Sequence, residues 1–423
     1  MAVLHSSFAR RLILQIASAL SQVAILICFV TYLPGLSDDP TGWAARYFVA
    51  LAVVSPIYVF FGFELRKITA SYDGADAGLL HRKRLLGLAL ATVASLLVLV
   101  LGLPFGLRGG GAVFLVVVLF RIVMGLHDQF LADFERQDRF GAAAISSLLK
   151  AVAFVLVAML VPLAASAAGV RAGADGTALL ATLSMLVIVY LYDIRRGTGI
   201  ELSSTIMLTS AERSNWPTYS SITREDWLTG LGSFLVSMTM NAPRLLAAIL
   251  VGELAVVLLG VGQSLNRCGQ IMSGGLTQML LVLRRRSGFG TGRFLLAAVA
   301  VQCAIFASMT LSLPIWKIAF PYVSGAQLFE TALVLLFFFG LLSQTNYLLQ
   351  SLRLVEGRVT DFVKSPVVFY VAFFLGIIFW SAIPDMTTNS EILGYLIVII
   401  GARTAQLLFN ARRASTARDG AEE

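Results

Sequence analysis

The chain has 423 residues, of which 58% are hydrophobic and 13% charged, and it carries a formal net charge of +8. With a mean hydropathy of +0.83, this composition excludes an ordinary soluble globular domain and indicates a protein that lies in lipid. The three cysteines and three histidines have neither disulfide-framework nor metal-ligand spacing, so we expect no metal and no other cofactor.

Apolar stretches long enough to cross a bilayer recur along the whole sequence. A membrane-spanning helix needs about 20 apolar residues, and by this measure the chain contains about twelve candidate spans. They cover residues 12 to 33, 43 to 63, 85 to 106, 111 to 130, 142 to 168, 177 to 193, 227 to 250, 254 to 283, 294 to 313, 328 to 351, 365 to 383 and 391 to 410. The predicted fold class is therefore an all-α polytopic membrane protein.

Basic residues are concentrated at both termini and in every second connection between the spans. The sequence contains "HRKR" at 81 to 84 and "RRR" at 284 to 286, whereas the alternate loops include the acidic "SDDP" at 37 to 40. Since positively charged loops tend to stay in the cytoplasm, both termini are predicted to be cytoplasmic. The same bias accounts for the net charge, so nucleic acid is not an expected partner.

The two halves of the chain resemble each other on either side of a long polar connection at its midpoint. When span seven is laid on span one so that Ser237 matches Ser18, Asn241 falls on Gln22. In each span the two residues are four apart and therefore lie on the same face of the helix. This match favours two parallel six-helix lobes around a central cavity. The predicted organisation is an N-terminal lobe at 1 to 196, a cytoplasmic linker at 197 to 226, a C-terminal lobe at 227 to 413 and a cytoplasmic tail at 414 to 423.

Basic residues also occur inside the predicted spans, where a charge costs about 2.5 to 3.5 kcal/mol on insertion scales. They are Arg46, Arg121, Lys150, Arg244, Arg267 and Arg403. Arg46 lies within a turn of its span start, so an interfacial anchor is an equal alternative to a role in the cavity. The others have no short route to either surface and are expected to face water or an anion.

Few acidic residues occur at comparable depth. Asp128 follows Arg121 on the same helical face and is the best candidate for a structural ion pair. The neighbouring His127 is expected to be an ordinary polar residue at a helix end. Because the cations outnumber the acids, some are expected to be neutralised by a bound anionic ligand.

Uncharged polar residues accompany these cations. Asn241 and Arg244 share a stripe of span seven, which Pro243 allows to bend. Further members of the predicted cavity are Gln22 in span one, Gln263 and Gln270 in span eight, and Asn346 in span ten. Hydrogen bonding between helices is the alternative explanation. A cationic, amide-rich cavity suits a substrate with phosphate and sugar hydroxyls, and it suits a cationic drug poorly.

Three stretches carry a resemblance to a known family. They are "RYFVALAVVSPIYVFFGFELRK" in span two, "GLHDQFLADFERQDRF" leaving span four and "NAPRLLAAILVGELAVVLLGVGQSL" across spans seven and eight. They resemble the Wzx-type oligosaccharide-lipid flippases of the multidrug/oligosaccharidyl-lipid/polysaccharide exporter superfamily, and the likeness in topology extends over the whole chain. The sequence departs from the family pattern at Leu245, where an aromatic residue often follows, and at Ala255, where a glycine is expected.

The resemblance implies a non-enzymatic flippase of the bacterial cytoplasmic membrane. Such a protein moves undecaprenyl-diphosphate-linked oligosaccharide from the cytoplasmic to the periplasmic leaflet by alternating access, for the synthesis of surface polysaccharides such as O-antigen. Its implied partners are the lipid-linked substrate, membrane lipids and other polysaccharide assembly proteins.

Two alternative functions stay open. An ion-coupled drug or metabolite exporter of the same superfamily would need a buried carboxylate, and the sequence shows none at the middle of a span. A polysaccharide polymerase or ligase would need a long outer loop, which the sequence does not predict.

Overall fold

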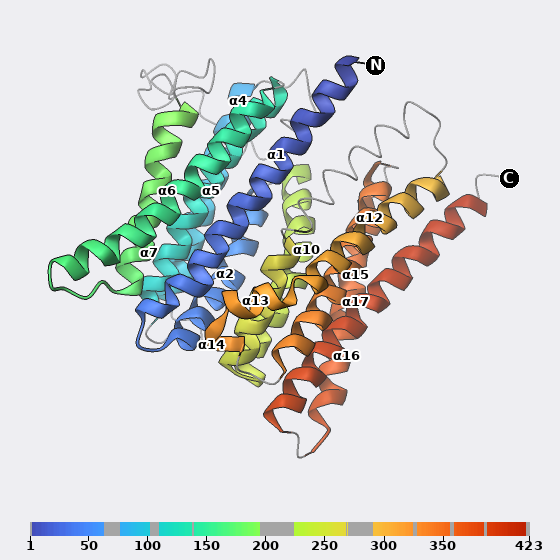
Figure 1. Ribbon diagram of the computed structural model, residues 1–423. Helices are drawn as coiled ribbons and strands as arrows, with labels where there is room; N and C mark the ends of the chain where they lie inside the picture. Colours follow the sequence, from blue (N-terminus) through green and yellow to red (C-terminus); the bar gives the residue numbers. More distant parts are fainter. Residues whose placement is uncertain are drawn as a thin grey trace. The chain divides into compact units, whose positions relative to one another are not determined.

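The computed structural model describes residues 2 to 62, 77 to 101, 110 to 137, 139 to 194, 224 to 267, 269, 291 to 324, 328 to 355, 359 to 384 and 387 to 419. Every regular element in these ranges is a helix (Figure 1). Within the described part of the chain, ten helices are long and apolar enough to cross a membrane, and a bent pair, Val299–Leu311 with Leu313–Ala319 at 53°, brings the number to eleven. The predicted class of all-α polytopic membrane protein is confirmed.

The predicted eighth span, 254 to 283, is helical from residue 253 to 267, and most of its remainder lies outside the described residues. It begins directly after α10 (Arg224–Leu250). Gly252 makes this tight turn possible because its φ is +119°, a conformation that costs other residues energy. The amide of Gly252 donates to the carbonyl oxygen of Ala247 over 2.8 Å, which closes the end of α10.

The chain forms two compact units, Met1–Met238 and Thr239–Glu423. The predicted lobe and linker boundaries at 196 and 227 remain a prediction, since residues 195 to 223 are not among those described. α10 contributes its first part to one unit and its second part to the other.

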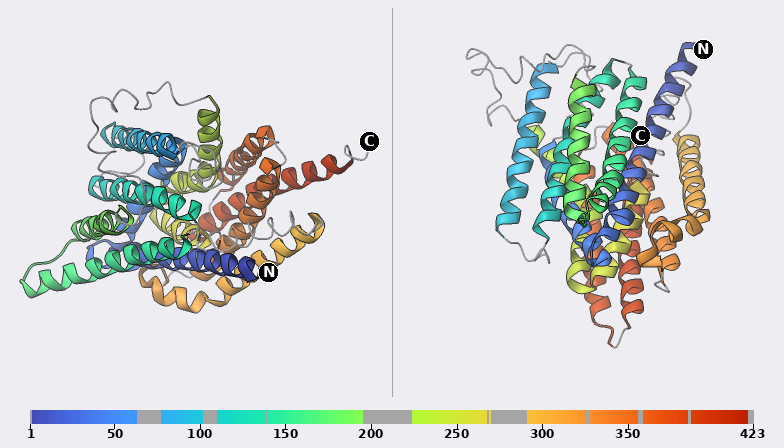
Figure 2. Two further views of the ribbon diagram at one scale, coloured as in Figure 1. Left: turned by 90° about the horizontal axis from the view of Figure 1, so that it is seen from above. Right: turned by 60° about the vertical axis from the view of Figure 1, so that its left-hand side comes forward.

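The N-terminal unit consists of helices that pack along one another. Its elements are α1 (Ala2–Ile27), η1 (Cys28–Tyr32), η2 (Pro34–Leu36), α2 (Pro40–Gly62), α4 (Ala77–Val100), α5 (Gly111–Arg136), α6 (Phe140–Ala167), α7 (Ala174–Ile188) and η3 (Val189–Ile194). α6 packs against α1 and α7, and α2 packs against α4 and α5 (Figure 2). Phe29 lies at the centre of this unit, 4.6 Å from the ring of Tyr47 and 4.9 Å from that of Phe154. This packing brings α5, α6 and the end of α7 together.

The C-terminal unit is built around α17 (Thr388–Asp419). Its further elements include α12 (Thr291–Leu311), α13 (Leu313–Ala319), α14 (Pro321–Ser324), α15 (Phe329–Val355) and α16 (Val359–Ser381). α17 packs against α15 and α16. Gly340 on α15 lets the helix at 253 to 267 approach closely, because a Cβ atom there would lie 2.1 Å from Asn266 Oδ1.

Candidate functional site

A buried group of ionisable side chains lies inside the N-terminal unit. Lys150 on α6 is 2% exposed, His127 on α5 is 3% exposed and Asp193 on η3 is fully buried. Lys150 Nζ lies 3.3 Å from Asp193 Oδ2 and donates to Ser146 Oγ over 2.9 Å. Lys150 Nζ also lies within hydrogen-bonding distance of His127 Nδ1. We call these four residues the Lys150 cluster.

Two further contacts complete the Lys150 cluster. Asp193 Oδ2 is 3.2 Å from His127 Nδ1, and the hydroxyl of Ser146 donates to Asp193 Oδ1. On the other side of the imidazole, His127 Nε2 lies 3.4 Å from Ser147 Oγ. An ammonium, a carboxylate and an imidazole therefore meet in a place closed to solvent, where isolated charges are costly and paired ones are retained.

The π-helical turn η3 is what brings Asp193 into this position. The backbone of α7 changes from α-helical to π-helical at Val189, so the last residues of this span are rotated relative to a continuous α-helix. Such turns are frequent at functional sites. The carboxylate of Asp193 thereby points at α5 and α6, which its contacts with His127 and Ser146 demonstrate.

The prediction that His127 is an ordinary polar residue at a helix end is wrong, since it is buried in α5 and contacts Lys150, Asp193 and Ser147. Lys150 is 2% exposed and pairs with a carboxylate of the same chain, and its role in binding a substrate remains a prediction. Sequence reasoning missed Asp193 because it is the last residue of the predicted span 177 to 193, where a straight helix would place it at the membrane surface. The signal that existed was a lysine and an aspartate in consecutive spans.

Arg121, also in the N-terminal unit, donates from Nη2 to the hydroxyl of Ser55 on α2. Its side chain is half-buried. Gln22 on α1 is half-buried as well. The role of both residues in binding a substrate remains a prediction.

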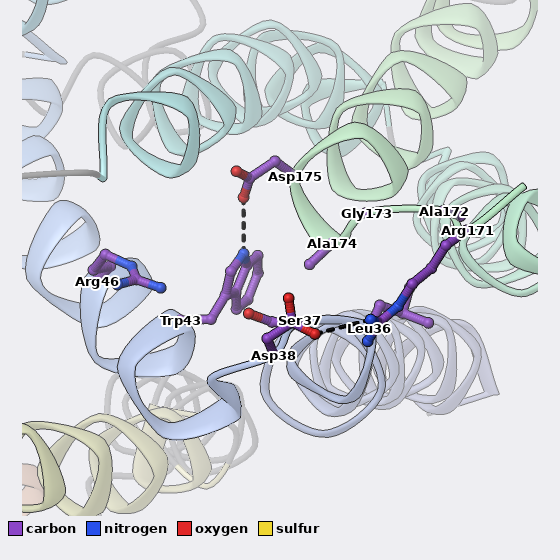
Figure 3. Close-up of a pocket in the computed structure, with 10 residues that line it drawn as sticks. All are labelled: Leu36, Ser37, Asp38, Trp43, Arg46, Arg171, Ala172, Gly173, Ala174 and Asp175. Carbon is purple, nitrogen blue, oxygen red and sulfur yellow. Dashed lines mark hydrogen bonds and ion pairs between the residues drawn. The ribbon is translucent and has the colours of Figure 1, made fainter.

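Arg46 lines a pocket of about 320 Å³ at one end of the N-terminal unit (Figure 3). Trp43 on the same helix donates from Nε1 to Asp175 Oδ1 over 2.8 Å, and Arg171 pairs with Asp38 at 2.9 Å. The side chains of Arg171 and Asp38 are 73% and 90% exposed. The position of Arg46 near the start of α2 agrees with either of its predicted roles, the anchor and the ligand-binding residue.

A second polar group, fully within the C-terminal unit, surrounds Arg403. The guanidinium donates from Nη1 to Gln406 Oε1 over 2.6 Å and from Nη2 to Thr239 Oγ1 over 3.0 Å. The guanidinium also lies over the rings of Phe339 and Phe369, whose centroids are 5.0 and 4.7 Å from Cζ. Arg403 is only 4% exposed. The expectation that Arg403 faces water is therefore wrong for this conformation, in which cation–π contacts and neutral acceptors hold the charge.

Amide side chains extend this group across three helices. Asn346 on α15 donates to Gln406 Oε1 over 3.3 Å. Asn410 donates to Asn346 Oδ1 over 2.7 Å and to Ser365 Oγ over 2.9 Å. All of these side chains are buried. Asn346 was predicted as a cavity residue, and the structure gives it the partners of a helix-to-helix hydrogen bond.

The remaining predicted residues fall into three classes. Arg244 is 7% exposed and donates from Nε to Gln263 Oε1, so these two predicted residues are in contact. Asn241 is buried on α10, one turn before Arg244. Arg267 is exposed, and Gln270 lies outside the described residues.

Comparison with known proteins gives a fold but no family. No family model matches the sequence, and no curated protein matches it either. Among solved structures, an inward-facing multidrug resistance MATE family transporter of the MOP superfamily matches with a TM-score of 0.64 at 15% identity, covering 96% of this chain and 99% of that chain.

Two further structures show the same fold. An outward-facing MATE family transporter of the MOP superfamily matches with a TM-score of 0.61 at 15% identity, covering 98% of this chain and 96% of that chain. A eukaryotic MATE transporter matches with a TM-score of 0.63 at 12% identity, covering 97% of this chain and 95% of that one. The chain therefore has, over almost its entire length, the fold of MATE transporters of the MOP superfamily.

Proposed function

We propose that the protein is an ion-coupled exporter that moves its substrate across the membrane by alternating access. The fold supports this proposal, since similar structures are described in inward-facing and outward-facing conformations. The division of the chain into two compact units provides bodies that can move against each other. In such a transporter, the ion binds to a group that is open to one side of the membrane in one conformation and to the other side in the other conformation. The ion gradient thereby drives the transport cycle.

The observation that carries ion coupling is the buried carboxylate of Asp193. Ionisable residues inside a membrane-spanning bundle are costly and mark ion pathways and proton relays. Asp193 is fully buried and contacts two other ionisable groups, His127 and Lys150. An exporter of this kind needs such a carboxylate, and the sequence alone showed none at the middle of a span.

The second candidate function is the flipping of lipid-linked oligosaccharide, and buried arginines favour it. Arg403 is 4% exposed and donates to the neutral groups Gln406 and Thr239. Arginine keeps its charge at any relevant pH and matches phosphate oxygens with a planar fork. A diphosphate head group is an anion of the kind that such a guanidinium binds. Under this hypothesis the protein lies in the bacterial cytoplasmic membrane with both termini inside and works with other polysaccharide assembly proteins.

The deciding experiment measures transport by the purified protein in proteoliposomes. We expect an imposed proton or sodium gradient to drive the movement of a fluorescent organic cation such as ethidium, and we expect Asp193→Asn to abolish it. Glu330→Gln is the matched control, because the Glu330 carboxylate is 57% exposed and pairs with an exposed lysine.

A complementation assay tests the second function in parallel. If the protein restores surface polysaccharide to a flippase-deficient strain and no gradient drives ethidium movement, the flippase replaces the exporter as the function. Movement of ethidium without any gradient, at the rate seen with one, would refute ion coupling.

A further inference from the structure

The environment of the Lys150 ammonium is that of a bound cation. Its neighbours are a carboxylate oxygen of Asp193 at 3.3 Å, the hydroxyl of Ser146 at 2.9 Å and the imidazole Nδ1 of His127. These groups come from α5, α6 and η3. Carboxylate and hydroxyl oxygens are also what hard metal cations such as sodium use as ligands. The ammonium group thus occupies the place that a sodium ion would take at Asp193.

We propose that Lys150 determines which ion this site accepts: it excludes sodium from Asp193 and leaves the proton as the coupling ion. This inference rests on the proposed ion-coupled export and names the ion and the residue that selects it. A sodium ion at Asp193 would lie next to a positive ammonium in a place closed to water, where charges repel strongly because the dielectric screening is weak. A proton needs no coordination sphere and can be taken up by a side chain already present.

The contacts at His127 Nδ1 show where that proton is held. Nδ1 faces two groups with opposite requirements, Lys150 Nζ and Asp193 Oδ2. Nδ1 accepts a hydrogen bond from the ammonium only when it carries no proton, and it donates to the carboxylate only when it carries one. One proton therefore decides which of the two bonds is formed. On uptake, a proton from water binds the lone pair of Nδ1 and is donated to Asp193 Oδ2, while Lys150 keeps Ser146 Oγ as its acceptor.

A further carboxylate lies near the Lys150 cluster. Asp128, the next residue on α5, acts electrostatically on both His127 and Lys150. The two carboxylates and one ammonium sum to a single negative charge, which a proton on His127 cancels. A sodium ion would add the same charge, but it needs as ligands the oxygens of Asp193 and Ser146 that the Lys150 ammonium already contacts.

The test measures binding of radioactive sodium to the purified, folded protein in detergent. We expect no saturable binding to the wild-type protein at neutral pH and a gain of saturable binding in Lys150→Gln, because the amide removes the positive charge and vacates the carboxylate. Lys150→Arg keeps a tethered cation and should still exclude sodium. Lys317→Gln is the matched control, since Lys317 is 46% exposed in the other unit. Adding Asp193→Asn to Lys150→Gln should remove the gained binding.

Several outcomes overturn the inference. Saturable sodium binding by the wild-type protein that Asp193→Asn abolishes refutes the inference. This measurement needs no change at Lys150, so it can be made even if Lys150→Gln does not fold. A folded Lys150→Gln protein that binds no sodium also refutes it. Export driven by a sodium gradient alone would keep the proposed function and overturn this inference. Gained sodium binding in Lys150→Gln, combined with export that no gradient drives, would sustain the role of Lys150 and refute the proposed function.

Discussion

The hydroxyl of Tyr395 donates to the main-chain carbonyl oxygen of Pro243 over 2.6 Å, which ties α17 to α10 at its internal proline. A proline inside a helix has no amide hydrogen, so the carbonyl one turn earlier loses its usual donor. That carbonyl belongs to Thr239, whose side chain accepts from Arg403. Two residues of α17 therefore hold α10 on either side of its weakest turn.

Tyr395→Phe should lower the free energy of unfolding by about 1 kcal/mol, since it removes one hydrogen bond and leaves the buried carbonyl of Pro243 with fewer partners. Thermal unfolding in detergent, followed by tryptophan fluorescence, measures the change. Tyr190→Phe is the control, because Tyr190 is 61% exposed. Equal melting temperatures for the two variants would show that the bond contributes nothing.

Arg403→Met should destabilise the C-terminal unit by about 1 to 3 kcal/mol, because the buried acceptors on Gln406 and Thr239 each lose one hydrogen bond. Arg403→Lys should recover little of the lost stability, since lysine has no planar group that could stack on the aromatic rings. The folded yield after size-exclusion chromatography and the melting temperature measure both effects. Arg267→Met, at an exposed position of the same unit, should change neither. A fully stable Arg403→Met that no longer transports would assign this residue to the substrate.

Lys150 and Asp193 should show strong energetic coupling. Removing one partner leaves the other charge buried and unpaired, so Lys150→Met and Asp193→Asn are each expected to cost about 3 to 5 kcal/mol. The double variant should be more stable than either single one, because no buried charge remains in the pair. A double-mutant cycle of melting temperatures, with Lys317→Met and Glu330→Gln as the exposed counterpart, measures this coupling. Additive losses at Lys150 and Asp193 would contradict the pairing.

Gly340→Ala should destabilise the protein by about 1 to 3 kcal/mol through overpacking. The added Cβ would meet Asn266, whose side chain donates to the carbonyl oxygen of Leu336 over 2.6 Å. Gly401→Ala is a matched control on α17, where a Cβ atom meets nothing within 4 Å. There alanine should be neutral or slightly stabilising, because it favours the helix over glycine. Thermal unfolding of the two variants decides whether the close approach of the helices is real.

The predicted orientation can be tested with single cysteines in a chain that lacks Cys28, Cys268 and Cys303. Asp38→Cys should react with a membrane-impermeant maleimide from outside intact cells, and Arg412→Cys should react only after the membrane is opened. Asp38 lies in an exposed connection between the first two spans, and Arg412 is exposed near the end of α17. Labelling of Arg412→Cys in intact cells would invert the topology.

Hydrophobicity made the class of this protein readable from its sequence. A helix in lipid must be long and apolar, with its backbone groups hydrogen-bonded internally, and every predicted span is a long apolar stretch. The Ser237 and Asn241 pattern and the internal proline also pointed to α10 as a special helix, and the structure gives Thr239 and Pro243 partners on α17. These features follow from residues close together in the chain.

Which polar residues meet becomes clear only from the packing of the helices. The sequence showed that Lys150, Arg244 and Arg403 lie within the spans, because a charged residue in an apolar run can be recognised directly. It did not determine that Asp193 neutralises Lys150, because a π-helical turn rotates that carboxylate toward α5 and α6. Nor did it show that the Arg403 guanidinium lies over the rings of Phe339 and Phe369. The physical reason is that a buried charge is stabilised by whichever partner the packing of distant helices supplies, and that choice depends on rotation and contact, which no local pattern of residues records.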